Sequence, residues 1–468
     1  MVGAIGVLTR YKDTDNMKMF GTNGIRGVVN GYMSPELALR TGKAIAKVLG
    51  PGPIAVARDT RTSADMISCA VMSGITSMGA DILDLGMTPT PSLQYYVKTR
   101  PGVTGGVMIT ASHNPPEFNG IKCISGDGTE CTPQEEEAIE NEYEKDPKGP
   151  GWESIGSVRR VSGAGEEYTD AVISRVDAAA IRAAGLKVCL DCSNGAASYT
   201  SPMLLKKLGV KVITLNSAAD GRFPGHYSEP TENNLSDLKK MVSETGCDIG
   251  IAHDGDADRC VFVTGSGRYV PGDQALAILG RSAVSKNGGG EVVTTVATSA
   301  VVEEAVRSAG GTVAYTAVGS PVVARRMMAD GALFGGEENG GLIFADHQFC
   351  RDGAMGLAKM LETVALSGPL DKLVDSLPVF TTFKEAVFCE DALKQKVIET
   401  IASRHKNENI NLTDGLRIDY DDGWVLLRPS GTEPKFRVYS ESKDPGTAKK
   451  RSVRFLEETE SVKSELSG

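Results

Sequence analysis

The sequence predicts an α/β protein, made of three related mixed α/β domains and a smaller C-terminal α+β domain. The first observation behind this prediction is a repeated order of helix, glycine and strand, which indicates one α/β unit in three places. The repeats lie at residues 63–85, 204–215 and 302–318. The second observation is that the C-terminal part combines short strands with flanking helices, which is typical of a separate α+β domain. These strands are expected near residues 381–388, 416–420, 424–427 and 436–440.

The first expected helix has clear start and stop signals. Ser34 can cap it, Pro35 suits its first position and Gly50 can end it. The residues between them place an apolar stripe on one face. A strand, a second helix and another strand are then expected at residues 54–57, 63–78 and 81–85.

Segments rich in Gly, Pro and Ser near residues 146–157 and 367–372 indicate two of the domain boundaries. A weaker boundary is expected near Arg259. Residues 1–16 precede Met17 and Met19 and are interpreted as an extension or an over-called start, so they are left out of the fold. The predicted domains are residues 17–150, 157–258, 259–368 and 371–468.

The charge of the chain restricts its partners. A net charge of −10 disfavours nucleic acid and anionic membranes, so neither is expected as a partner. An anionic small molecule would need local clusters of Arg and Lys. No apolar run approaches the roughly 18 residues that span a bilayer, and no signal peptide is recognisable. Nine cysteines, an odd number in a long chain, are typical of reduced intracellular thiols, so a cytoplasmic protein is expected.

The first candidate for chemistry is Ser112, in the segment 110–115 that follows the apolar run 105–110. This position predicts a loop at the carboxyl end of a strand, where ligands gather in α/β sheets. The adjacent His113 is a weak signal, because a sequence neighbour is seldom oriented to act as a base. An ordinary Asn-Pro turn is the competing interpretation.

The second candidate is the set Asp254, Asp256 and Asp258, which directly follows an apolar strand. Three carboxylates at alternate positions can converge on one hard cation, and oxygen ligands favour Mg²⁺ or Ca²⁺. An EF-hand is excluded because Arg259 stands where its glycine belongs. Two alternatives remain, namely solvated turn acids and an aspartyl-phosphate nucleophile at Asp254.

Two further loops contain residues suited to a sugar phosphate. In the segment 335–341, Glu337 and Asn339 can grip vicinal hydroxyls, although a tight acidic turn is an equal alternative. In the segment 428–434, a guanidinium, two hydroxyls and free amides surround a glycine, which fits a phosphate dianion. A P-loop would need a lysine directly after the glycine and a helix behind it, so ATP binding is not supported.

Taken together, these loops resemble the α-D-phosphohexomutase superfamily, and the resemblance extends from Phe20 to about Ser440. The segments that carry it are FGTNGIRG, TASHNPPEFNGIK, DGDADR, GGEENGG and RPSGTEPKFRV. The archaeal phosphoglucosamine and phosphomannose mutase branch is the most similar. The resemblance implies a heart-shaped molecule with a central cleft, whose last domain is similar to the TATA-binding protein.

The resemblance also implies roles for individual residues. Ser112 would carry the phosphoryl group and share one Mg²⁺ with Asp254, Asp256 and Asp258. Lys122 would be the candidate base. The groups around the reacting centre would be Arg26, His113, Lys122 and Arg259. Sugar hydroxyls and sugar choice would involve Thr316, Val318, Gly319, Glu337 and Asn339. The distal phosphate would be held by Arg428, Ser430, Gly431, Thr432 and Arg437.

One departure from the family pattern concerns the end of the sugar loop. Several relatives have a histidine there, where this chain has Gly341. His347 is a candidate to supply the imidazole to the substrate, and a surface or core histidine is an equal alternative.

The expected function is a phosphohexomutase that interconverts hexose 6-phosphate and hexose 1-phosphate through a phosphoserine and a 1,6-bisphosphate, which also serves as activator. Glucosamine, mannose and glucose phosphates all remain open as substrates, as do a monomer and a homo-oligomer. A Mg²⁺-dependent sugar-phosphate phosphatase is the alternative, and a catalytically idle binding protein is a third. A phosphatase would release phosphate and need no bisphosphate.

Overall fold

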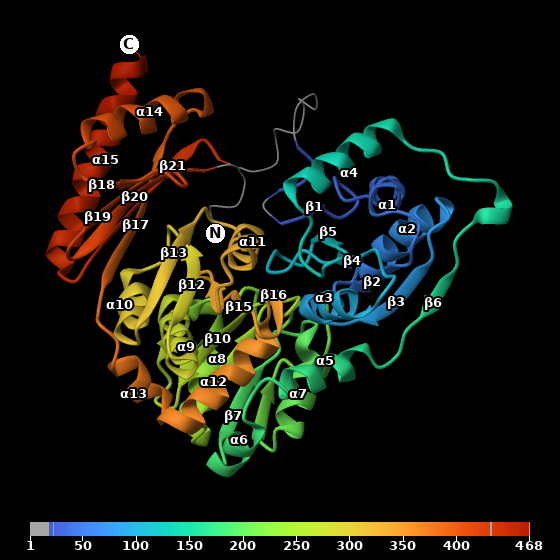
Figure 1. Cartoon of the computed structure of the whole chain (residues 1–468), viewed down its shortest axis with the longest axis horizontal. Helices are drawn as coiled ribbons and strands as arrows, with labels where there is room; N and C mark the ends of the chain where they lie inside the picture. Colours follow the sequence, from blue (N-terminus) through green and yellow to red (C-terminus); the bar gives the residue numbers. More distant parts are fainter. Residues whose placement is uncertain (1–17, 22, 431–432, 468) are drawn as a thin grey trace, which may run out of the picture.

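The computed structural model describes residues 18–21, 23–430 and 433–467, with four separate β-sheets along the chain. In Figure 1 the first domain (blue) and the fourth (red) lie at opposite sides, with the second (green) and third (yellow to orange) between them. The predicted α/β class and four-domain order are confirmed. Within the described residues, no helix has the length and apolar character needed to cross a membrane.

The first domain has a six-stranded mixed sheet in the order β1-β5-β4-β2-β3-β6. The predicted signals of its first helix are confirmed, because Ser34 accepts a hydrogen bond from the amide of Leu37 and Gly50 follows the last turn. Its elements are β1 (Ile25–Val28), α1 (Pro35–Leu49), β2 (Ile54–Arg58), α2 (Ala64–Ser77), β3 (Ile82–Met87), α3 (Thr90–Thr99), β4 (Gly105–Ile109), β5 (Phe118–Ser125), α4 (Pro133–Lys145), a 3₁₀ turn (Trp152–Ser154) and β6 (Val158–Arg160).

The second domain has a five-stranded sheet in the order β11-β10-β9-β7-β8. A boundary at residues 258/259 would divide the hairpin of β9 and β10, so we propose that this domain ends after Val270. Its elements are α5 (Ala164–Ile173), α6 (Ala178–Ala184), β7 (Lys187–Asp191), α7 (Ala197–Lys207), β8 (Lys211–Leu215), a 3₁₀ turn (Glu232–Leu235), α8 (Ser236–Thr245), β9 (Ile249–His253), β10 (Cys260–Thr264) and β11 (Tyr269–Val270).

The third domain has a five-stranded sheet in the order β13-β12-β14-β15-β16. Its last long helix, α12, begins at the cap Asp352, whose side chain accepts from the amide of Met355. The elements are α9 (Gly272–Asn287), β12 (Gly290–Thr295), α10 (Ala300–Ser308), β13 (Gly311–Thr316), α11 (Ser320–Asp330), β14 (Phe334–Gly336), β15 (Leu342–Phe344), β16 (Gln348–Arg351), α12 (Gly353–Ser367) and α13 (Leu370–Asp375).

The fourth domain has a different architecture, an antiparallel sheet in the order β17-β21-β20-β19-β18 with two helices. Its elements are β17 (Thr381–Phe388), α14 (Asp391–Arg404), β18 (Asn409–Asn411), β19 (Leu416–Tyr420), β20 (Gly423–Pro429), β21 (Lys435–Ser442) and α15 (Pro445–Ser467). A core of its own, which includes Val397, Phe436 and Phe455, separates it from the other three.

The first three sheets share one topology. The shared unit has four consecutive strands, which are β2 to β5 in the first domain, β7 to β10 in the second and β12 to β15 in the third. In each unit the first strand has the second and the third strand as parallel neighbours, and the fourth strand pairs antiparallel with the third. The connections from the third to the fourth strand are residues 110–117, 254–259 and 337–341. These three equivalent loops contain Ser112, the three aspartates and Glu337. The three predicted loops therefore occupy equivalent positions, between the third and fourth strands of each repeated unit.

Candidate active site

Ser112 lies in the loop between β4 and β5 and is fully buried. Its backbone has φ 51°, a left-handed conformation that a non-glycine residue adopts only when its surroundings hold it there. The Ser112 hydroxyl donates to Asp254 Oδ2 at 2.8 Å and lies 3.3 Å from His113 Nδ1. The first and second loops of the repeat thus meet at this oxygen.

The backbone of the Ser112 loop is held by a residue that the sequence did not single out, Arg61. Its buried guanidinium donates to backbone carbonyl oxygens throughout the loop, and its Nε donates to Asp59 Oδ2 at 3.1 Å. The four carbonyl acceptors are those of Ser112, Asn114, Pro115 and Phe118. Asp59 in turn accepts from Thr110 Oγ1, which accepts from the Ser112 amide. One buried cation thereby fixes the loop that presents the serine.

Asp254, Asp256 and Asp258 lie between β9 and β10, fully buried, and offer carboxylate oxygens that lie within 4.8 Å of one another. Burial and the two neighbouring carboxylates raise the pKa of Asp254 well above its usual range. Among the described residues, Oδ1 of Asp256 and Oδ1 of Asp258 find no hydrogen-bond donor. Buried carboxylate oxygens without partners fit a hard cation such as Mg²⁺, and their residues are the ones predicted to hold it.

Lys122, on β5, points into this cluster. Its Nζ donates to Asp256 Oδ2 at 2.7 Å and to Asp258 Oδ2 at 3.1 Å. Burial disfavours the charged form of Lys122, but the two carboxylates outweigh this effect and raise its pKa. Lys122 is therefore a cation in this arrangement.

Further basic side chains surround the cluster. Arg26 Nη1 donates to Asn114 Oδ1 at 2.8 Å, and Arg259 Nε lies 3.9 Å from carboxylate oxygens of Asp254 and Asp258. The buried Nε atoms of both arginines find no acceptor among the described residues, which suits an anionic substrate. Burial, Arg259 and Arg26 lower the pKa of His113 to about 3, so its imidazole is neutral at neutral pH.

The third loop of the repeat is a closed turn at the end of β14. Glu337 Oε1 accepts from the amide of Gly319 at 3.1 Å, and Asn339 Oδ1 accepts from the amide of Gly341 at 3.0 Å. Glu337 thus meets the loop that follows β13, which contains Val318 and begins directly after Thr316, the last residue of that strand. The hydroxyl of Thr316 donates to the Ala317 carbonyl at 2.9 Å, within that loop.

The fourth-domain residues lie at the ends of β20 and β21. Arg428 and Arg437 are paired across these strands and are partly exposed. Arg428 Nε donates to Asp414 Oδ2, which also accepts from the amide of Val318. Asp414 thus links the predicted phosphate loop to the loop that follows β13. Ser430 is buried, and its carbonyl accepts from Lys394. Gly431 and Thr432 lie outside the described residues.

Models of the phosphoglucomutase/phosphomannomutase family match the chain along nearly its whole length. The α/β/α domains I, II and III match residues 17–149, 166–267 and 271–380, and the C-terminal domain matches residues 387–458. The chain belongs to this family of phosphohexomutases.

Relatives at equal identity have names that refer to different sugars. A probable phosphoglucosamine mutase of Methanopyrus kandleri is 41% identical over 94% of this chain and 97% of its own. A phosphoglucomutase/phosphomannomutase of Thermococcus kodakarensis is also 41% identical, over 94% and 99%. A phosphoglucomutase/phosphomannomutase family protein of Burkholderia thailandensis has the same fold, with a TM-score of 0.85, 25% identity, and coverage of 94% and 97%.

Within this phosphohexomutase, His347 does not join the Glu337 loop. It is buried, its ring stacks on Tyr95 at 5.3 Å between centroids, and it lies against Tyr168 and 3.4 Å from Asp352 Oδ2. Its ring neighbours come from α3, α5 and the start of α12, in the first three domains. We therefore propose a packing role for His347 between domains in place of the predicted contact with substrate.

A second residue that the sequence did not single out, Arg351, occupies the space between the second and third loops. Its Nη2 donates to Asp258 Oδ2 at 2.6 Å and its Nη1 to Glu337 Oε2 at 3.4 Å. The only signal in the sequence was a charged residue at the end of the short strand β16. Arg61, which holds the Ser112 loop, has a similar signal in the sequence. It lies with Asp59 in the segment that follows β2.

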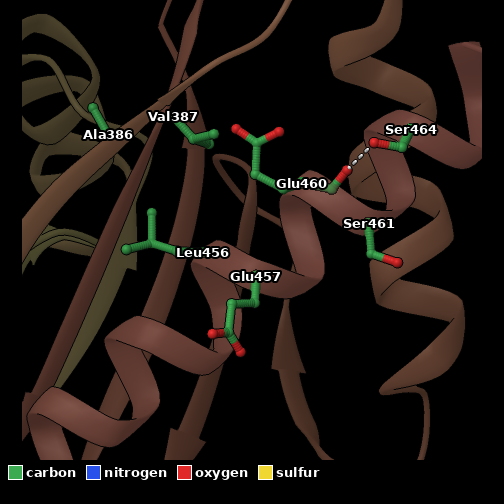
Figure 2. Close-up of a pocket in the computed structure, with 7 residues that line it drawn as sticks. All are labelled: Ala386, Val387, Leu456, Glu457, Glu460, Ser461 and Ser464. Carbon is green, nitrogen blue, oxygen red and sulfur yellow. Dashed lines mark hydrogen bonds between the residues drawn. The ribbon is translucent and has the colours of Figure 1, made fainter.

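The hollow drawn in Figure 2 is a different feature, about 530 Å³ in volume and formed by β17 and α15 of the fourth domain. Its described lining carries the carboxylates Glu457 and Glu460 and no cationic side chain. Because such a lining repels phosphate, this hollow is unsuited to the substrate of a phosphohexomutase.

Proposed function

We propose that this phosphohexomutase uses Ser112 as its phosphoryl carrier and interconverts hexose 6-phosphate and hexose 1-phosphate through a 1,6-bisphosphate. The observation that carries the proposal is the Ser112 hydroxyl, which donates to Asp254 Oδ2 at 2.8 Å inside a buried cluster of three carboxylates. A phosphate on this oxygen would stand beside the groups suited to a cation and beside Lys122, Arg26 and Arg259.

In the proposed reaction, the bond between phosphorus and Ser112 Oγ breaks as a sugar hydroxyl oxygen bonds to phosphorus and gives up its proton. The resulting bisphosphate turns over, and its other phosphate returns to Ser112. Lys122 and the two arginines neutralise charge on the transferring group. When bound by Asp254, Asp256, Asp258 and the phosphate, Mg²⁺ would polarise that phosphate and offset the carboxylates that keep Lys122 protonated. Lys122 is the proposed acceptor of the hydroxyl proton.

The distal half of the proposed site binds the phosphate that does not react. Arg428, Arg437 and Ser430 are proposed to hold it, together with Gly431 and Thr432. Two arginines directly opposite each other on neighbouring strands repel, and Asp414 pairs with Arg428. A phosphate would offset the charge of both arginines, which supports a phosphate here. Glu337 and Asn339 are proposed to read the sugar hydroxyls, with Thr316, Val318 and Gly319 beside them.

Mass spectrometry with peptide mapping tests the proposal directly. The chain purified with Mg²⁺ is expected to carry one phosphate on Ser112, and glucosamine, mannose and glucose 6-phosphates are then compared by the rate of 1-phosphate formation. Ser112→Ala should abolish turnover, whereas Ser73→Ala, an exposed serine of the same domain, should not. Phosphate release without 1-phosphate, from an enzyme unmodified at Ser112 even with bisphosphate, would instead establish a phosphatase.

The proposed location is the cytoplasm. All nine cysteines are free thiols, and eight of them are buried, which suits a reducing compartment.

A further inference from the structure

Gly341 and Arg351 are in closer contact than any side chain at position 341 would permit. A Cβ atom added to Gly341 would lie 2.3 Å from Cδ of Arg351 and 3.0 Å from its Cγ. Both distances are too short for carbon atoms, which pack at about 3.5–4.0 Å. The Arg351 side chain therefore crosses the sugar loop through the space that only glycine leaves open.

The guanidinium of Arg351 is held at both of its ends by carboxylates. One belongs to Glu337 of the third domain and the other to Asp258 of the second. All three side chains are almost fully buried, so solvent screens their charges little. Without the cation between them, the two carboxylates would repel each other.

Asp258 Oδ2 receives a second cation, Lys122 Nζ, at 3.1 Å, while its Oδ1 finds no donor among the described residues. Arg351 thus forms an ion pair with Asp258, a carboxylate that is proposed to hold the metal. It also keeps Glu337 next to Asp258. Its own Nε finds no acceptor within the described part of the chain, so the side chain has a donor to spare.

We propose that Arg351 is a positioning residue of this mutase, and that Gly341 and Arg351 form a matched pair that ties the sugar-binding carboxylate Glu337 to the metal loop at Asp258. The inference rests on the proposed roles of Glu337 and Asp258. The pair then has two opposite effects. Arg351 raises the affinity for the sugar phosphate by holding Glu337, and it lowers the affinity of Asp258 for a cation.

The test measures both effects on the full chain with Arg351→Ala, using Arg326→Ala, an exposed arginine of the same domain, as the control. The KM for the best sugar 6-phosphate should rise about tenfold or more, with a smaller fall in kcat, because Glu337 is no longer held. Titration of the metal-stripped protein with Mg²⁺ should show at least about threefold tighter binding, because a competing positive charge is gone. Arg351→Lys should recover part of the lost sugar affinity.

A double-mutant cycle then tests the pairing. Gly341→Ala alone should raise KM as Arg351→Ala does, because the new Cβ displaces the guanidinium, and it should add little in the Arg351→Ala background. Independent, additive effects of the two substitutions would overturn the pairing. Unchanged KM and Mg²⁺ affinity in Arg351→Ala, or a parallel weakening of both, would overturn the positioning role.

The readouts separate this inference from the proposed function. If the wild-type chain carries phosphate on Ser112 and the Arg351 variants behave like the control, only the role of Arg351 is lost. If Ser112 of the wild-type chain stays unmodified in the presence of bisphosphate, the proposed function itself is wrong.

Discussion

The two ends of the proposed site are built in opposite ways. At the Ser112 end, the serine, Lys122 and the three aspartates are all fully buried, and every side chain has partners from another loop or domain. At the fourth-domain end, Arg428 and Arg437 are partly exposed and lie at the ends of two antiparallel strands. The first end belongs to a repeated α/β unit, the second to a domain with a core of its own.

This difference fits the two tasks. Transfer of a phosphoryl group depends on charges that are already oriented before the reaction, and burial strengthens their effect. The proposed distal phosphate site must accept either phosphate of the sugar in turn, so a separate domain with partly exposed arginines suits it better. We expect damage at the Ser112 end to lower kcat and damage at the fourth-domain end to raise KM. Two of the following predictions test this contrast, and two concern the stability of the metal loop and of the contact with the fourth domain.

The largest effect is expected from Arg61→Lys. A lysine keeps the charge but cannot reach four carbonyls and a carboxylate at once, so buried acceptors lose their donors. We expect kcat to fall about a thousandfold, or about 4 kcal/mol, together with a lower Tm. The control is Arg222→Lys, an exposed arginine. A kcat within threefold of the wild type would show that the Ser112 loop holds its shape by itself.

Metal removal should have the next largest effect. If Mg²⁺ binds only the folded protein, a concentration one hundred times its Kd should stabilise the chain by about 2.7 kcal/mol, and chelation should remove this gain. Thermal unfolding with and without Mg²⁺ measures it. Asp256→Asn should largely abolish the gain, because it removes one carboxylate charge from the cluster. An equal Mg²⁺ shift in that variant would place the ion elsewhere.

Arg428→Ala tests the other end of the site. We expect the KM for a hexose 6-phosphate to rise about thirtyfold, or about 2 kcal/mol, with little change in the phosphate content of Ser112. Arg454→Ala, an exposed arginine of the same domain, is the matched control. A fall in kcat with constant KM would contradict the contrast between the two ends.

The smallest effect concerns the contact between the third and fourth domains. Burial and the carboxylate of Glu338 raise the pKa of Asp273 to about 7, with Glu441 of β21 contributing in the same direction. Because the folded chain then holds this proton more tightly than the unfolded chain, its stabilising contribution is complete below about pH 4 and is lost as pH rises to about 7.

Asp273→Asn removes this titration. The variant should match the wild type near pH 4 and be more stable by about 1 kcal/mol or more at pH 8. This is less than the full linkage of such a shift, because Asp273 is partly exposed and solvent screens its charge. Thermal unfolding at both pH values measures the difference, with the exposed Asp421→Asn as the control. Equal stabilities of variant and wild type at pH 8 would mean that the charge of Asp273 is fully compensated in the folded protein.

Most of the fold could be predicted because its signals are local. Ser34, Pro35 and Gly50 mark the start and end of α1 because their residue types suit helix caps. The repeated helix, glycine and strand pattern indicated the related units. The boundary predicted near Arg259 falls at the turn of the hairpin between β9 and β10, which resembles a linker when strand pairing is unknown. Pairing depends on hydrogen bonds between two strands, which the periodicity within each strand does not reveal.

The candidate site shows the same division. The loops with Ser112, the three aspartates and Glu337 stood out because unusual residue types follow apolar strands. Arg61 and Arg351 escaped notice because their importance lies in which distant atoms they reach, the Ser112 loop in one case and Glu337 in the other. His347 is the reverse case, since its closeness in sequence to Gly341 says nothing about the packing of its ring against Tyr95.

The hydrogen bonds from Arg61 to the Ser112 loop have a consequence for how natural variants of this enzyme are interpreted. A genome survey that checks the recognisable segments around Ser112, Asp254, Glu337 and Arg428 would score an Arg61 variant as a working gene. Yet the serine loop of such a variant would have lost its main support, from a position 51 residues away in sequence. Surveys of sequence variants in this family should therefore include Arg61, which none of these segments contains.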